Sequence, residues 1–178
     1  IKYDKTPVIF VSGHFSNFEL MAMEIEKSGV NLAAIYRPLN NIFLNVLMER
    51  LRNKYICKNQ IKKGTSGVRQ LLKLYKQGYS IALMIDQRVT EGIKSKFFNQ
   101  DAFTTTIPAQ FIKKFKCKVV PIYIERSNDI NFRIKIDRPI EFSEETSAEK
   151  ITRDLNIWLE KMILKDPGKW IWSHNRWK

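Results

Sequence analysis

Three short apolar runs in this chain alternate with longer segments in which apolar residues recur at helical spacing. The apolar runs are 8–11, 32–36 and 80–85. The segments with helical spacing are 17–27, 41–54 and 66–77. Strands that alternate with helices form parallel sheets with right-handed crossovers. The sequence therefore predicts an α/β fold in which helices flank a largely parallel sheet.

The first apolar run leads through a glycine to His14, and Glu19 follows five residues later. This position is the carboxyl end of a predicted strand, where open α/β sheets bind ligands. A histidine and a carboxylate suit proton removal from an alcohol, with His14 as general base and Glu19 fixing its tautomer. Backbone amides of a helix predicted from about Ser16 are candidates for an oxyanion site. The alternative is a histidine that caps a helix or packs under the sheet.

Polar residues follow each predicted strand, and the carboxyl ends of parallel strands meet at one edge of a sheet. We therefore expect one rim to gather His14, Glu19, Arg37, Asp86, Gln87 and Arg88. Asp86 is predicted to organise this rim by pairing with an arginine, and the alternative is a turn residue at the strand end. Taken singly, Arg37 and Asp86 are typical of solvated loops.

The segment Gly13-His14-Phe15-Ser16-Asn17-Phe18-Glu19 resembles the first motif of the bacterial lipid A biosynthesis acyltransferases. These enzymes transfer lauroyl or myristoyl chains and are related to the glycerolipid acyltransferases with H-x4-D. Further segments that resemble the family in order and spacing are 36–39, 67–72, 85–87, 97–104, 119–121 and 170–178. An H-x4-E spacing alone is weak, whereas this ordered series is specific. One departure is Asn99, where the family usually has glycine after paired phenylalanines.

The resemblance implies an O-acyltransferase of the H-x4-E type, with no cofactor. It would transfer a fatty acyl chain from acyl carrier protein to a hydroxyl of a phosphorylated lipid A precursor, at the cytoplasmic face of the bacterial inner membrane. Implied substrate contacts are Arg37, Arg69, Asp86, Gln87, Arg88, Phe97 and Phe98. Arg37 and Arg69 stand where the family has basic contacts. The alternatives are another glycolipid or phospholipid acceptor, or hydrolysis of the thioester by water.

Family members carry a membrane-anchoring helix ahead of the H-x4-E strand. This chain begins at Ile1 and has no apolar run near the roughly eighteen residues that a span needs. No Gly/Ser/Pro-rich linker divides it. We therefore interpret 1–178 as a single acyltransferase catalytic domain without that anchor. Toward the carboxyl terminus, alternation over 131–137 predicts an antiparallel edge strand, and 147–164 has the spacing of an amphipathic helix. The aromatic residues of 90–105 are expected in a loop.

The chain carries a formal net charge of +13, from 31 basic and 18 acidic side chains. Between Arg50 and Ile85 every charged residue is basic. Such a surface attracts an anionic membrane, an acidic acyl carrier protein or nucleic acid, or it simply keeps the protein soluble. No helix-turn-helix, zinc-finger or RNP pattern is visible, so no nucleic acid is expected. Cys57 and Cys117 fit no metal-ligand spacing, and we expect reduced thiols and no metal site.

Overall fold

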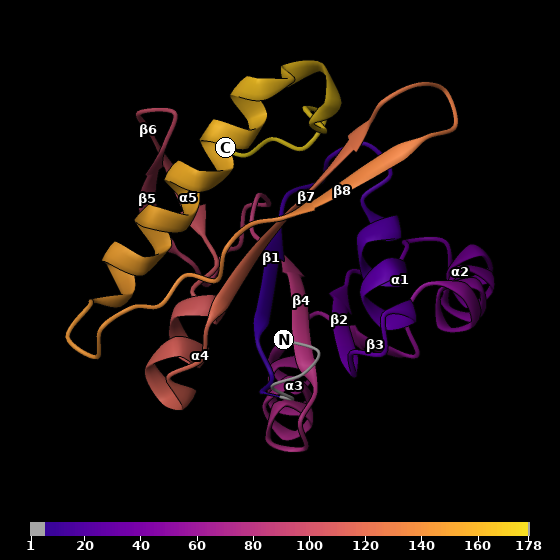
Figure 1. Ribbon diagram of the computed structural model, residues 1–178, viewed down its shortest axis with the longest axis horizontal. Coiled ribbons are helices and arrows are strands. Elements are labelled where there is room, and N and C mark those ends of the chain that lie inside the picture. Colours follow the sequence, from indigo (N-terminus) through magenta and orange to yellow (C-terminus); the bar gives the residue numbers. More distant parts are fainter. Residues whose placement is uncertain (1–5, 178) are drawn as a thin grey trace. The chain divides into compact units, whose positions relative to one another are not determined.

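The computed structural model describes residues 6–177 of the chain. The described part of the chain divides into two compact units, one made of 6–10 and Glu19–Leu83 and the other of Val11–Phe18 and 84–177. Figure 1 labels the helices and strands of these units. Strands β1 (Ile9–Ser12) and β4 (Ser80–Met84) contribute residues to both units. The single catalytic domain over 1–178 stays a prediction.

The main sheet has six strands in the order β3-β2-β4-β1-β7-β8. The three strands predicted from the apolar runs, β1, β2 (Leu32–Tyr36) and β4, are therefore neighbours. This arrangement confirms the predicted α/β fold with a largely parallel sheet. β1 and β4 are hydrogen-bonded to each other in both units. In the first unit, the amide of Ile81 donates to the carbonyl of Val8, and in the second, the amide of Ile85 donates to the carbonyl of Ser12.

In the first unit, β2 pairs in parallel with β4 on one side and with β3 (Asn59–Lys62) on the other. The helices of this unit are α1 (Glu19–Lys27), α2 (Ile42–Tyr55) and α3 (Thr65–Lys76). β3 was not predicted, because Ile61 is its only apolar residue and four residues carry little periodicity. α1 begins two residues after the predicted start, since Ser16 has a left-handed backbone with φ of 44° that interrupts a helix.

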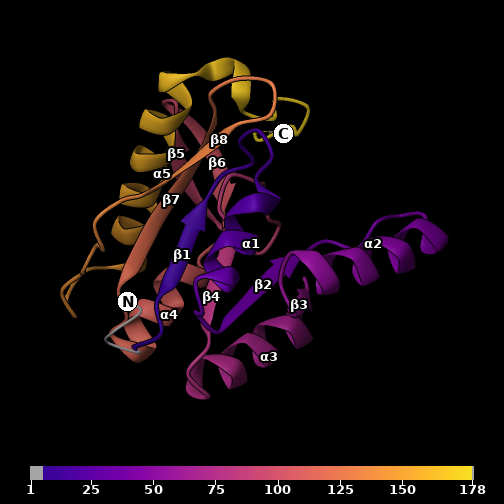
Figure 2. The ribbon, with the colours of Figure 1, turned by 45° about the vertical axis from the view of Figure 1, so that its right-hand side comes forward.

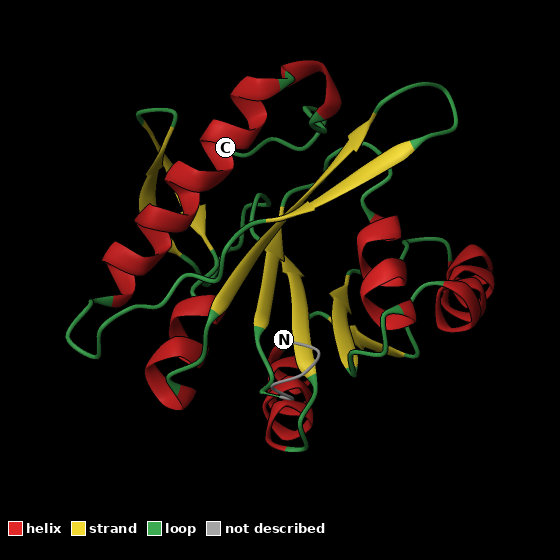
Figure 3. Ribbon diagram, in the orientation of Figure 1, coloured by secondary structure: helices red, strands yellow, loops and turns green. Residues whose placement is uncertain are grey.

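In the second unit, β7 (Val119–Arg126) pairs antiparallel with β8 (Phe132–Ile136), which confirms the predicted edge strand (Figure 3). Helices α4 (Ile107–Phe115) and α5 (Ala148–Lys165) and the short 3₁₀ helix η1 (Pro167–Lys169) complete it. α5 buries Ile151, Leu155 and Leu159, as its apolar spacing predicted.

Residues 90–105 contain a second, two-stranded sheet, so the prediction of a loop was wrong there. β5 (Ile93–Phe97) pairs antiparallel with β6 (Gln100–Thr104). Ser95 and Phe97 are buried whereas Lys94 and Lys96 are exposed, which is the alternation of a strand with one wet face. Phe98 and Asn99 form the turn with φ of 49° and 60°, so both residues adopt the left-handed conformation that a two-residue hairpin turn requires.

Candidate active site

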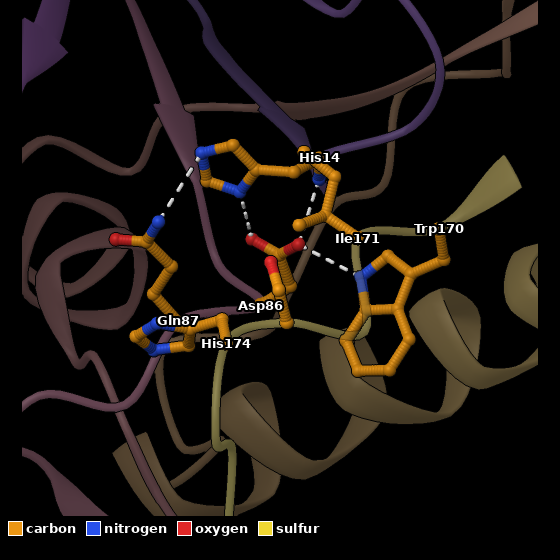
Figure 4. A pocket seen from close by; sticks show the side chains of 7 residues that line it. His14, Asp86, Gln87, Trp170, Ile171 and His174 are labelled. Atoms are coloured by element: carbon orange, nitrogen blue, oxygen red, sulfur yellow. Dashed lines mark hydrogen bonds and ion pairs between the residues drawn. The ribbon is translucent and has the colours of Figure 1, made fainter.

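A pocket of about 220 Å³ lies at the carboxyl ends of β1 and β4 (Figure 4). His14 follows β1, and Asp86 and Gln87 follow β4, so the prediction that these three share a rim is confirmed. The carboxyl-terminal segment supplies the other lining residues, which are Trp170, Ile171, Ser173 and His174. All of these residues belong to the second compact unit.

Asp86 holds His14 by two hydrogen bonds. Its Oδ1 lies 2.7 Å from Nδ1 of the imidazole, and its Oδ2 accepts from the backbone N–H of His14 at 2.7 Å. An ionised carboxylate only accepts hydrogen bonds, so Nδ1 carries a proton and Nε2 of the neutral ring is left as the basic nitrogen. Nε2 lies 3.4 Å from the side-chain amide nitrogen of Gln87. The histidine side chain is 16% exposed and that of Asp86 is 3% exposed, so the pair is shielded while the ring stays accessible.

The environment of Asp86 keeps its carboxyl ionised. Burial raises the pKa of this group. Hydrogen bonds from the side chain and backbone of His14, the electrostatic interaction with its imidazole, and the hydrogen bond from the indole of Trp170 outweigh burial and lower the pKa below its ordinary value. Trp170 donates from Nε1 to Oδ2 at 2.8 Å. An ionised Asp86 holds the imidazole in one orientation and is placed to stabilise an imidazolium.

Gly13 leaves room for this pair. A Cβ atom at this position would lie 2.8 Å from Cδ1 of Leu159 and 3.2 Å from Oδ2 of Asp86. Any side chain here would therefore press on the carboxylate and on the α5 core. This packing explains why glycine precedes the histidine.

The carboxyl-terminal segment pairs with the loop that carries His14. The amide of Ile171 donates to the carbonyl of His14, and the amide of Ser16 donates to that of Lys169. The amide of Phe15 donates to the carbonyl of Gly13. The amides of Phe15 and Ser16 are thus engaged, and the expectation that backbone amides near Ser16 form an oxyanion site is wrong for these two.

Trp170 and His174 were not predicted as site residues. The imidazole Nε2 of His174 accepts from the backbone N–H of Arg88 at 3.1 Å, which brings the second histidine of the chain to the same pocket as the first. A signal existed, since 170–178 is one of the segments that resemble the family. Spacing alone does not tell which side chains of an aromatic tail face a site.

Phe97 is a fully buried ring that supports the tail. It packs against Trp170 and Trp177 with ring centroids 6.0 and 5.7 Å apart, and the guanidinium of the buried Arg176 lies 5.1 Å from its centroid. Burial lowers the pKa of Arg176 to about 10, although the charge of Asp86 opposes the shift. Phe98 donates its amide N–H to Oε1 of Glu160 at 2.8 Å. Contact of either phenylalanine with a substrate stays a prediction.

The remaining predicted residues have other surroundings. Asp86 pairs with His14, not with an arginine, so that part of the prediction is wrong. Glu19 lies in the first unit, where its Oε1 accepts from Nε of Arg52 at 2.8 Å, and the Nδ1 contact expected of Glu19 is made by Asp86. Arg37 and Arg69 are exposed residues of the first unit, and Arg88 is an exposed residue next to the pocket. Within residues 6–177, no three or more His, Cys, Asp or Glu side chains cluster as metal ligands.

Comparison with known proteins gives one family for the whole chain. The family described as "Bacterial lipid A biosynthesis acyltransferase" matches residues 1–178. A relative from Haemophilus influenzae, described as "Lipid A biosynthesis acyltransferase", is 26% identical over 179 residues, which cover 98% of this chain and 56% of that protein. The chain thus spans little more than half the length of this relative. Since the family match extends over every residue, the chain belongs to the bacterial lipid A biosynthesis acyltransferase family.

Proposed function

We propose that the protein transfers a fatty acyl chain from an acyl thioester to a hydroxyl of a lipid A precursor, with His14 as general base. One observation carries the mechanism. The buried, ionised Asp86 binds Nδ1 of His14, which leaves Nε2 as the proton acceptor at the pocket. Membership in the family supports the acyltransferase class and the lipid acceptor.

In the proposed reaction, Nε2 of His14 takes the proton of the acceptor hydroxyl as its oxygen attacks the thioester carbonyl carbon. A carbon–oxygen bond forms, and collapse of the tetrahedral intermediate breaks the carbon–sulfur bond. The imidazolium then gives its proton to the departing thiolate, and Asp86 stabilises the imidazolium between the two transfers. Since the amides of Phe15 and Ser16 are engaged, we assign the side-chain N–H of Gln87 as the donor to the developing oxyanion.

The proposed donor is acyl carrier protein, whose acidic surface would suit the basic charge of this chain. The exposed guanidinium groups of Arg37, Arg69 and Arg88 are proposed contacts for acceptor phosphates, because one guanidinium group can bind two phosphate oxygens at once. Phe98 is proposed to contact the acyl chain. The proposed place of action is the cytoplasmic face of the bacterial inner membrane. Among residues 6–177, no helix is long and apolar enough to cross a membrane.

Mass spectrometry of membrane lipids tests the reaction. Cells with the full-length protein, cells without it and cells with its His14→Ala variant are compared. We expect a lipid A species that is heavier by one acyl chain only where His14 is present. The mass difference identifies the acyl chain, and the parent lipid identifies the acceptor. Free fatty acid without an acylated lipid would indicate a thioesterase, and a heavier phospholipid would indicate another acceptor.

A further inference from the structure

Helix α2 in the first unit exposes the apolar side chains that helices normally bury. Phe43 is 89% exposed, Leu47 is 53% exposed and Leu51 is 41% exposed. None of the residues of this helix is buried. Ile42, Leu44, Val46 and Tyr55 add further exposed apolar surface. Large apolar side chains that are exposed together on one helix are typical of an interaction site.

The polar side chains of α2 hold the helix to the rest of its unit. Oε1 of Glu49 accepts from the hydroxyl of Tyr36 in β2 and, within the helix itself, from the side-chain amide of Asn45 at 2.7 Å. Farther along, Nε of Arg52 donates to Oε1 of Glu19 at 2.8 Å. Asn45, Glu49 and Arg52 are spaced to share one side of a helix. The helix therefore turns its polar side inward, and Figure 2 shows it extending outward beyond β2 and β3 of its own unit.

The exposed side of α2 combines apolar and basic residues along its length. Phe43 and Leu47 are followed on the same side by Arg50, Leu51 and Lys54, all exposed. No acidic residue occurs from Arg50 to Ile85, and exposed basic residues continue at Lys58, Lys62, Lys63, Arg69, Lys73 and Lys76. Helices that present apolar and basic side chains together to solvent are typical of elements that bind in the plane of a membrane interface, where basic residues attract anionic lipids.

We propose that α2 docks this protein on an anionic lipid surface. Phe43, Leu47 and Leu51 insert below the level of the head groups, and the basic residues of 50–76 contact the head-group phosphates. A second copy of the chain fits poorly, because it would bring two strongly basic surfaces together. An acidic protein would match the charge but would leave the large aliphatic and aromatic side chains without a matching environment. The charge of the chain predicted an anionic membrane as a partner, and this proposal names α2 as the element that contacts it.

Vesicle binding by the 178-residue chain tests the proposal. We expect binding to vesicles of phosphatidylcholine with phosphatidylglycerol, weaker binding to phosphatidylcholine alone, and a steep loss with added salt. The double variant Phe43→Ser/Leu47→Ser should weaken binding roughly a hundredfold, because each fully buried apolar side chain contributes about tenfold. The matched control Ile130→Ser/Leu164→Ser changes side chains that are 83% and 66% exposed outside α2, and it should bind as the parent does. Arg50→Glu/Lys54→Glu should weaken only the binding to anionic vesicles.

Insertion is measured by an environment-sensitive dye on Phe43→Cys. The native thiols of Cys57 and Cys117 are 1% and 6% exposed, so labelling is directed to the new cysteine. Vesicles should shift the emission of the dye at position 43 to shorter wavelength and leave a dye on Ile130→Cys unchanged. Equal shifts, or undiminished vesicle binding by Phe43→Ser/Leu47→Ser with a native circular dichroism spectrum, would overturn the proposal.

Two further outcomes would assign the helix to a different partner. If Phe43→Ser/Leu47→Ser loses binding to acyl carrier protein but still binds vesicles as the parent does, α2 is a protein-docking surface. If the same variant sediments differently from the parent chain but still binds vesicles as the parent does, α2 is a contact between copies of the chain. All these measurements omit substrates, so lipid docking can fail while the proposed acyl transfer stands.

Discussion

The indole of Trp170 donates to Oδ2 of Asp86 at 2.8 Å, while Oδ1 of the same carboxylate lies 2.7 Å from Nδ1 of His14. The carboxylate is thus bound from two sides, by His14, which lies two residues beyond the end of β1, and by Trp170 of the carboxyl-terminal segment. Because both oxygens are engaged, the orientation of the imidazole depends on a tail that lies far from it in sequence.

Replacement of His14 tests the general base directly. His14→Ala should lower the rate of acyl transfer by roughly a hundredfold to ten-thousandfold, the usual range for loss of such a group. The measurement is transfer of a labelled acyl chain by the purified full-length enzyme. Circular dichroism should show an unchanged fold, because the ring is partly exposed and not part of the core. A folded variant with parental activity would make His14 structural.

Asp86→Asn and Glu19→Gln separate the carboxylate found beside the histidine from the one predicted by spacing. Asp86→Asn should lower kcat by about as much as His14→Ala, since a neutral amide does not stabilise the imidazolium. Glu19→Gln should have a smaller effect, because the Glu19 carboxylate binds Arg52. If Glu19→Gln instead loses as much activity as His14→Ala, then Glu19 acts on the histidine, as the H-x4-E spacing predicted.

Trp170→Phe keeps an aromatic ring and removes one donor to Asp86. A hydrogen bond to a charged group contributes about 1.5–3 kcal/mol, so the free energy of unfolding should fall by about that amount. We also expect a lower kcat with KM little changed, because the variant misorients the pair without touching the acceptor. The matched control is Trp172→Phe, whose indole donates to the carbonyl of Pro167 and not to Asp86. Equal effects of the two variants would contradict a positioning role for Trp170.

Acid should abolish the stabilisation by Asp86. The pKa of Asp86 is lower in the folded protein than its ordinary value, so the unfolded chain binds more protons in acid. The stabilisation is complete above the unfolded pKa of about 3.9 and disappears as the pH falls through the folded pKa. Denaturant unfolding should therefore show that the stability advantage of wild type over Asp86→Asn shrinks below about pH 4. A stability advantage that grows as the pH falls would mean that folding raises the pKa of Asp86 and does not lower it.

Gly13→Ala should be overpacked, because the added methyl group meets Leu159 and Asp86. Such insertions cost about 1–3 kcal/mol, and the displaced carboxylate should also lower activity. Leu159→Ala opens space at the closest contact. In a double-mutant cycle, the two substitutions together should therefore destabilise the protein by less than the sum of the single effects. Strict additivity would mean that the methyl group is accommodated elsewhere.

The sequence predicted much of the fold, because periodicity is a local property. The three apolar runs identified β1, β2 and β4, and the helical spacing over 147–164 identified α5. The β5–β6 hairpin was missed although its alternation is present, because aromatic residues among polar ones were interpreted as a loop. β3 was missed because it has too few apolar residues to stand out.

The sequence alone placed His14 just beyond the carboxyl end of a strand in a parallel sheet and predicted that a carboxylate lies beside it. Which carboxylate pairs with it was decided by the tertiary structure. Spacing favoured Glu19, but local spacing predicts a contact only through continuous helical geometry, and the left-handed backbone of Ser16 interrupts it. Asp86 is 72 residues away in sequence, and it reaches His14 because β1 and β4 are adjacent and Gly13 leaves room for the carboxylate. The contribution of Trp170 likewise comes from the packing of the tail, which no local pattern contains.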